Sequence, residues 1–214
     1  MKKFAIGCLI VAAVLIVVGG ILGYFFIWRP ASGYIASFRE LGQLPALEKQ
    51  VANTASFAAP ENGELTEELV GRFVRVQEAM EKSLGPTFGQ LKTKYDGMEK
   101  VMKSENRQAS AIEGLTALKD LTSIIVQGKH AQIEALNANN FSLAEYSWVR
   151  SQVYAAAAIP LAQLDLSNIA EAARGGDIVK APEEVSDIPA RNKELVAPYA
   201  EKLKEWAALG FIGL

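Results

Sequence analysis

The sequence predicts an all-α protein with one N-terminal transmembrane helix and an outer bundle of four to six helices. Three observations predict this fold class. Residues 4–28 form an apolar stretch without a charge, and most of the remaining chain repeats its apolar residues at helical spacing. No segment alternates clearly between apolar and polar residues, as a half-buried strand would.

The apolar stretch has the length and the flanks of a membrane anchor. It runs for 25 residues from Phe4 to Trp28, and about 20 are enough to cross the hydrocarbon core of a bilayer. Tyr24, Phe26 and Trp28 lie at its far end, where aromatic rings are typical of the membrane interface. Because the stretch is too long for a secretory signal and lacks a good cleavage site, residues 1–29 are predicted to be a signal anchor.

The flanking charges predict the orientation. Lys2 and Lys3 precede the anchor, whereas only Arg29 follows it closely, so the positive-inside rule places the N-terminus in the cytoplasm. Residues 31–214 then lie on the periplasmic side of a bacterial inner membrane. Cys8 closes a lipobox-like sequence and leaves a lipoprotein signal as an alternative, but too little of the apolar stretch precedes it.

Small residues form one stripe along the predicted membrane helix. The stripe consists of Cys8, Ala12, Gly19 and Gly23, and its last two members make a GxxxG pattern that lets two helices approach closely. We therefore expect helix packing through this stripe, against another membrane protein or a second copy of the chain.

The outer part of the chain is mildly acidic. It holds all 24 acidic residues and, once Lys2, Lys3 and Arg29 are set aside, 19 of the 22 basic ones. Nucleic-acid binding requires clustered basic residues, so this composition argues against a nucleic-acid partner.

The outer part divides into a linker and a helical domain. Residues 30–63 are predicted to be a juxtamembrane segment with a short helix that Pro45 interrupts, and residues 64–214 to be the extracytoplasmic helical domain. Its first helix has Thr66 as N-cap and is expected to end at Gly85-Pro86. The apolar stripes of this helix and the next are Leu69, Phe73, Val76, Met80 and Leu84, and then Phe88, Leu91, Tyr95, Met98 and Met102.

Three later elements follow from the same patterns. A long helix is predicted from about residue 105 to 136, with Gly128 as a weak point and turn-forming residues after it. Ser142 and Glu145 have the spacing of a capping box and open a helix that ends near Ala158. Residues 174–190 are expected to be a loop or extended segment, and a last helix covers about residues 192–209.

No catalytic, cofactor-binding or metal-binding set is evident. His130 is the only histidine and Cys8 the only cysteine, so the usual zinc and iron ligand sets cannot be assembled from the sequence. The phosphate-binding glycine loops are absent as well. We therefore expect a protein that is not an enzyme and has no cofactor.

Three residues are candidate partner contacts. Trp148 points away from the apolar face formed by its helical neighbours, so it is either covered by a second layer or left exposed as an interface anchor. Arg150 either forms a salt bridge within the bundle or contacts a partner. Phe211 belongs to the apolar tail of residues 210–214, which either folds back or inserts into a partner.

Three short motifs, residues 73–77 (FVRVQ), 145–150 (EYSWVR) and 210–214 (GFIGL), resemble an uncharacterised family of bacterial membrane-anchored, periplasmic helical proteins. The resemblance covers most of residues 57–214. It implies a bacterial source and no activity that can be transferred to particular residues.

Together these observations favour a structural or accessory subunit of a larger membrane complex, for which a photosynthetic or respiratory complex is one host. An alternative is a periplasmic small-ligand-binding module tethered to the membrane, since helical bundles can hold small molecules. A cell-envelope enzyme is the weakest of the three interpretations.

Overall fold

In the computed structural model, the described residues are 41–108, 110–160, 163–164, 179–180, 187–211 and 214. They are almost entirely helical, which confirms the predicted all-α class. The helices are α3 (Leu44–Glu48), α4 (Glu67–Ser104), α5 (Ala111–Ala138), α6 (Leu143–Ala156), α8 (Ala190–Val196) and α9 (Ala200–Phe211), with the 3-10 turn η3 (Ala197–Tyr199) between the last two. The strands β1 (Gln163–Leu164) and β2 (Val179–Lys180) form one two-residue antiparallel ladder.

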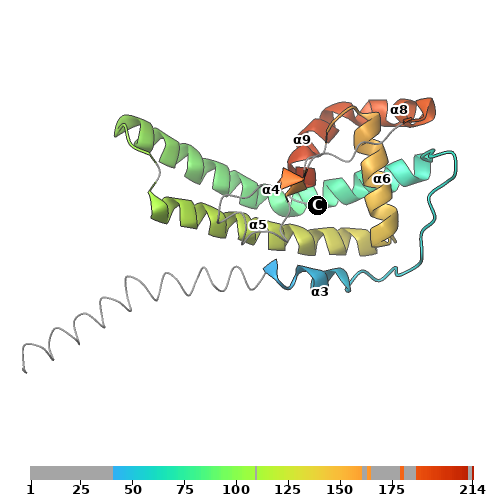
Figure 1. Ribbon diagram of the computed structural model, residues 1–214, viewed down its shortest axis with the longest axis horizontal. Coiled ribbons are helices and arrows are strands. Elements are labelled where there is room, and N and C mark those ends of the chain that lie inside the picture. Colours follow the sequence, from blue (N-terminus) through green and yellow to red (C-terminus); the bar gives the residue numbers. More distant parts are fainter. Residues whose placement is uncertain (1–40, 109, 161–162, 165–178, 181–186, 212–213) are drawn as a thin grey trace, which may run out of the picture.

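A long hairpin of α4 and α5 organises the molecule (Figure 1). The helix α6 crosses the end of this hairpin where α5 ends, α8 and α9 lie on one side of it, and α3 packs against α5 on the other. Because α6 follows α5 after a turn of only a few residues, it must pack at this end, which we call the base of the hairpin.

The core lies at the base of the hairpin. The fully buried apolar residues of α4 all fall between Val70 and Leu84, and α6 contributes Tyr146, Val149 and Val153 to the same cluster. Trp206 of α9 is 2% exposed and completes the core, while its indole N–H donates to Glu81 at 2.9 Å. Burial of a large aromatic side chain is worth about 2–3 kcal/mol, so α9 is held firmly against α4.

The predicted break at Gly85-Pro86 is wrong, because α4 continues through both residues to Ser104. Proline inside a helix removes one hydrogen bond and costs about 3 kcal/mol. The apolar stripe explains why the helix continues. The step of four residues from Leu84 to Phe88 keeps the apolar residues on one face of α4, and α4 packs along α5. Figure 1 shows that α4 bends along its length, as expected for a helix that contains a proline.

The long helix α5 begins later than predicted. Ser110 and Glu113 form a full capping box there, and Arg107 donates to both carboxylate oxygens of Glu113, lowering the pKa of this carboxyl to about 2. The helix passes through Gly128 without a break. It ends at Ala138, at the predicted run of turn formers, where Asn140 has a positive φ of 53°.

Two further expectations concern prolines. Pro45 lies in the first turn of α3, where its missing N–H costs nothing, and the short helix predicted before it falls almost entirely outside the described residues. The last helix is divided, because Pro198 lies in the 3-10 turn η3 between α8 and α9. The Thr66 N-cap is confirmed: its hydroxyl oxygen accepts from the Leu69 amide at 3.1 Å.

The predicted transmembrane helix lies outside the described residues. Among the residues that are described, none of the helices combines the length and the apolar character needed to cross a membrane.

Candidate functional site

The three motifs noted in the sequence meet at the base of the hairpin. Residues 73–77 lie on α4 and residues 145–150 on α6, and Leu214, the last residue of the third motif, packs on α5. Several buried polar side chains of the described residues are found here, among them Gln77, Gln132 and Ser142. This junction joins α4, α5 and α6.

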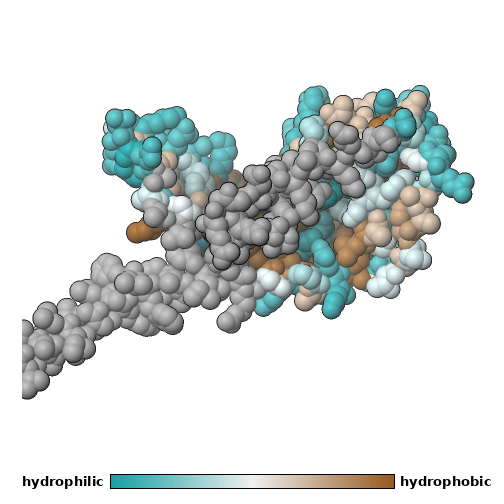
Figure 2. All heavy atoms as spheres, viewed as in Figure 1, coloured by the Kyte–Doolittle hydropathy of each residue, from teal (hydrophilic) through white to brown (hydrophobic). Residues whose placement is uncertain are grey.

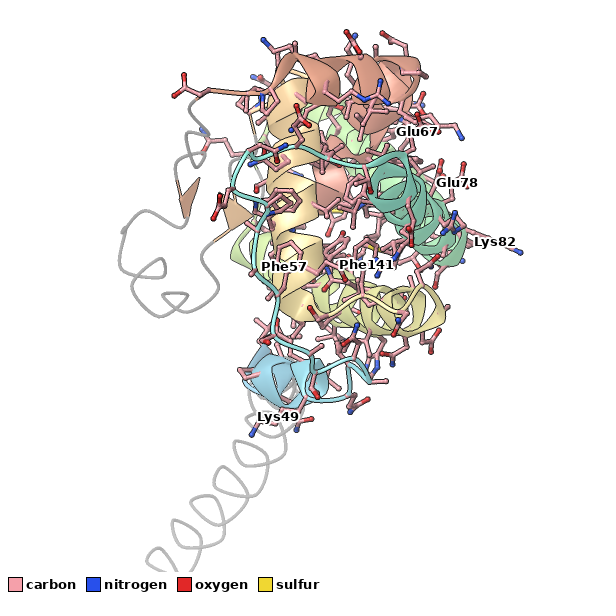
Figure 3. All side chains as sticks on the ribbon, turned by 90° about the vertical axis from the view of Figure 1, so that its right-hand side faces the viewer. Lys49, Phe57, Glu67, Glu78, Lys82 and Phe141 are labelled. Carbon is pink, nitrogen blue, oxygen red and sulfur yellow. The ribbon has the colours of Figure 1, made fainter. Side chains whose placement is uncertain are left out.

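Arg72 ties α4 to the α5–α6 turn and to α6. It donates to both carboxylate oxygens of Glu145, at 2.8 and 3.1 Å, and to the backbone oxygens of Asn139 and Asn140, at 3.0 and 2.7 Å. The guanidinium also lies over the Phe141 ring, 3.8 Å from its centroid, and Figure 3 shows Phe141 between the helices. Only arginine has the planar set of donors that this arrangement uses.

The predicted capping box at Ser142 is half formed. The Ser142 hydroxyl oxygen accepts from the Glu145 amide at 3.2 Å, as predicted. The Glu145 carboxylate turns to Arg72 instead of reaching back to the Ser142 amide, because a bidentate ion pair is stronger than a single neutral amide contact. Glu145 therefore serves tertiary packing more than helix capping.

A chain of hydrogen bonds crosses the buried core beside this ion pair. Gln77 donates to the Tyr146 hydroxyl group at 2.8 Å, and the Gln132 side chain also hydrogen-bonds this hydroxyl. Lys129 donates to Gln132 at 2.9 Å and to Glu48 of α3 at 3.0 Å. Burial raises the pKa of Tyr146 above its ordinary value, so the phenol stays neutral and the network fixes the helices relative to one another.

The end of the third motif folds back onto the body. Leu214 is fully buried, and a Cβ atom added to Gly128 would lie 2.1 Å from its Cδ1 atom. Arg150 donates to the backbone oxygen of Leu214 at 2.8 Å. Any larger residue at position 128 would require the Leu214 side chain to shift from this position. The contact to Leu214 is therefore an intramolecular role for Arg150, and the Phe211 side chain is not among those described.

Trp148 lies half-buried on the outer face of α6. Its ring centroid is 5.4 Å from that of Phe57, at an interplanar angle of 46°. Figure 3 shows Phe57 on the extended segment that runs beside α6. The residues before α4, expected to be a linker, thus provide the covering layer, while part of the indole stays open to a partner.

We expect Trp148→Ala to lower the free energy of unfolding by about 1–2 kcal/mol, since half of a large aromatic contact is lost. Phe57→Ala should cost about 1 kcal/mol, and the double variant should cost less than the sum of the two. Urea unfolding of the full chain in detergent, followed by circular dichroism, measures all three. Strict additivity would show that the two rings do not support each other.

Beyond the base, the hairpin carries an open apolar groove of about 420 Å³. Residues of α4 and α5 line it: Phe88, Leu91, Lys92, Tyr95, Ala117, Asp120, Leu121 and Ile124. The Tyr95 hydroxyl donates to Asp120 at 2.8 Å, and burial together with this bond raises the pKa of Tyr95 to about 12. The sequence pattern identified Phe88, Leu91 and Tyr95 as part of the apolar stripe of a helix, but it gave no sign of a groove beside them.

The remaining candidates give no chemical site. His130 is exposed on α5, and within the described ranges no group of three or more His, Cys, Asp or Glu side chains is placed to hold a metal ion. The candidate membrane residues lie outside the described part of the chain: Cys8, Ala12, Gly19, Gly23, Tyr24, Phe26 and Trp28.

Comparison with known proteins gives no further assignment: no family model matches the chain, and no curated protein or solved structure is significantly similar to it.

Proposed function

We propose that the chain is a non-catalytic, single-pass membrane protein that acts as an accessory subunit of a larger membrane complex. The observation that carries this proposal is the uncharged stretch from Phe4 to Trp28, with its stripe of small residues, in front of a helical domain. In this proposal residues 1–29 are the anchor, the N-terminus is cytoplasmic, and residues 31–214 are periplasmic.

The contacts of the outer domain support a structural role. Its most elaborate polar groups, Arg72 with Glu145 and Gln77 with Tyr146, are directed at one another and hold helices together. The half-exposed indole of Trp148 and the open groove of the hairpin are surfaces of the kind that bind partners. A photosynthetic or respiratory complex remains one proposed host.

The Gly19→Ile/Gly23→Ile variant tests the role of the anchor. We expect it to reduce the amount of partner recovered with a tagged chain from gently solubilised membranes by about tenfold or more, because two branched side chains prevent close helix approach. Far-UV circular dichroism should show an unchanged outer domain.

Ala13→Ile/Gly20→Ile is the matched control. At about 100° per residue these positions lie away from the small-residue stripe, so a similar gain in volume should leave partner recovery unchanged. Equal loss in both variants would refute docking through the stripe. Migration of the unmodified chain without any partner would refute the accessory role and favour the tethered small-ligand module.

A further inference from the structure

The outer half of the α4–α5 hairpin is left without a covering layer by the described residues. From residue 85 to residue 121, none of the described side chains is fully buried, whereas both helices are well buried nearer the base. The described hydrogen bonds from α6 and α9 to α4 reach no further along α4 than Glu81. We call residues 85–121 the distal hairpin.

The distal hairpin still carries apolar residues. Phe88 and Val101 of α4 are 36% and 45% exposed, and Ile112 in the first turn of α5 is 72% exposed. Figure 2 shows hydrophobic atoms at this outer end of α5. Leu91 of α4 and Leu121 of α5, both partly buried, line the groove. Two helices alone cannot bury such faces, and a four-helix arrangement can.

The residues that line the groove include one basic and one acidic side chain, Lys92 and Asp120. Lys92, on the α4 side, is 75% exposed and pairs only with its helical neighbour Asp96 among the described contacts. Asp120, on the α5 side, accepts from Lys94 and Tyr95, and both contacts use the same oxygen, Oδ2. After a two-fold rotation, Lys92 of one copy can pair with Asp120 of the other in exchange for the contacts that these two side chains make with Asp96 and Lys94.

We infer that the distal hairpin binds the distal hairpin of a second copy of this chain, so that the two form a four-helix bundle. In this dimer Lys92 of each copy lies opposite Asp120 of the other, and Leu91 and Leu121 of both copies close the apolar interior. The inference goes beyond the accessory role and holds or fails independently of any larger complex.

Overall charge and size both suit a second copy. Residues 85–121 contain six basic and five acidic side chains, so their net charge is close to zero and two copies do not repel each other. A strongly charged partner would not be attracted to this surface electrostatically. The α4 part from residue 86 to 104 is about 28 Å long and two helices are about 20 Å wide. A face of these dimensions is about 560 Å², so two copies bury about 1,100 Å² in total, just above the roughly 1,000 Å² that a specific interface needs.

Zero-length carbodiimide cross-linking of the full chain in native membranes tests the dimer. We expect a covalent dimer in which mass spectrometry finds an amide bond between Lys92 of one copy and Asp120 of the other. Leu91→Arg should reduce this dimer about tenfold or more, because it places a charge inside the apolar contact. Leu195→Arg is the matched control, since Leu195 is also a partly buried leucine on the core, and it should keep the dimer.

Lys92→Glu is a second variant that tests the dimer even if Leu91→Arg fails to fold, because position 92 is exposed and tolerates the change. Light scattering of the purified full chain in detergent should then show mainly monomer, as like charges would face each other twice. A monomeric unmodified chain would overturn the inference. A dimer that persists in Leu91→Arg and lacks the 92–120 bond would also overturn it, since association would then occur elsewhere.

Discussion

Replacing Arg72 with methionine is expected to lower the free energy of unfolding by about 3–5 kcal/mol. Both side chains of the Arg72–Glu145 pair are largely shielded, at 14% and 16% exposure, so the change leaves a carboxylate without its cation. It also removes the donors to the backbone oxygens of Asn139 and Asn140. Urea unfolding of the full chain in detergent, followed by far-UV circular dichroism, measures the loss.

Arg191→Met provides a matched control. Arg191 also pairs with a glutamate of α4, Glu67 at 3.0 Å, but the two side chains are 49% and 79% exposed, so the expected cost is below about 1 kcal/mol. Arg72→Lys should be intermediate, since lysine replaces the charge but not the four directed bonds. A loss for Arg72→Met no larger than that for Arg191→Met would refute the role assigned to the junction.

The helical class and most helix ends could be predicted because they depend on local chemistry. The Thr66 cap and the asparagine-rich end of α5 act within a few residues, so the sequence reports them directly. The continuity of α4 could not be predicted, because a proline signal is local whereas the packing that offsets it comes from α5, across the hairpin. The unbroken helical spacing of the apolar residues Leu84 and Phe88 was the feature of the sequence that indicated a continuous helix.

The candidate contacts were harder to predict, because each depends on a segment distant in sequence. Periodicity placed Trp148 off the core face of α6 but could not show that Phe57 would cover it. Glu145 has the spacing of a capping residue, and only the position of Arg72 redirects it. From helix propensity alone, Gly128 is predicted to be a weak point of the helix. In the structure, its missing side chain makes room for Leu214.

Gly128→Val is expected to lower the free energy of unfolding by about 2–4 kcal/mol. The new side chain would displace Leu214 from its buried position, which forfeits about 1.5–3 kcal/mol of apolar burial, and any remaining overlap adds strain. Urea unfolding of the full chain measures the effect. Gly114→Val on the same helix is the control, because a Cβ atom there meets nothing within 4 Å. It should be neutral or slightly stabilising.

A second pair of variants separates the tail contact from helix propensity. Gly128→Ala gains about 1 kcal/mol of helix propensity but still excludes Leu214, so in the unmodified background the net effect should be a loss. In the Leu214→Ala background no large side chain competes for the space, and the same substitution should become stabilising. This change of sign is specific to a tail that packs on α5. A Gly128→Ala effect with one sign in both backgrounds would mean that Leu214 does not occupy this position in solution.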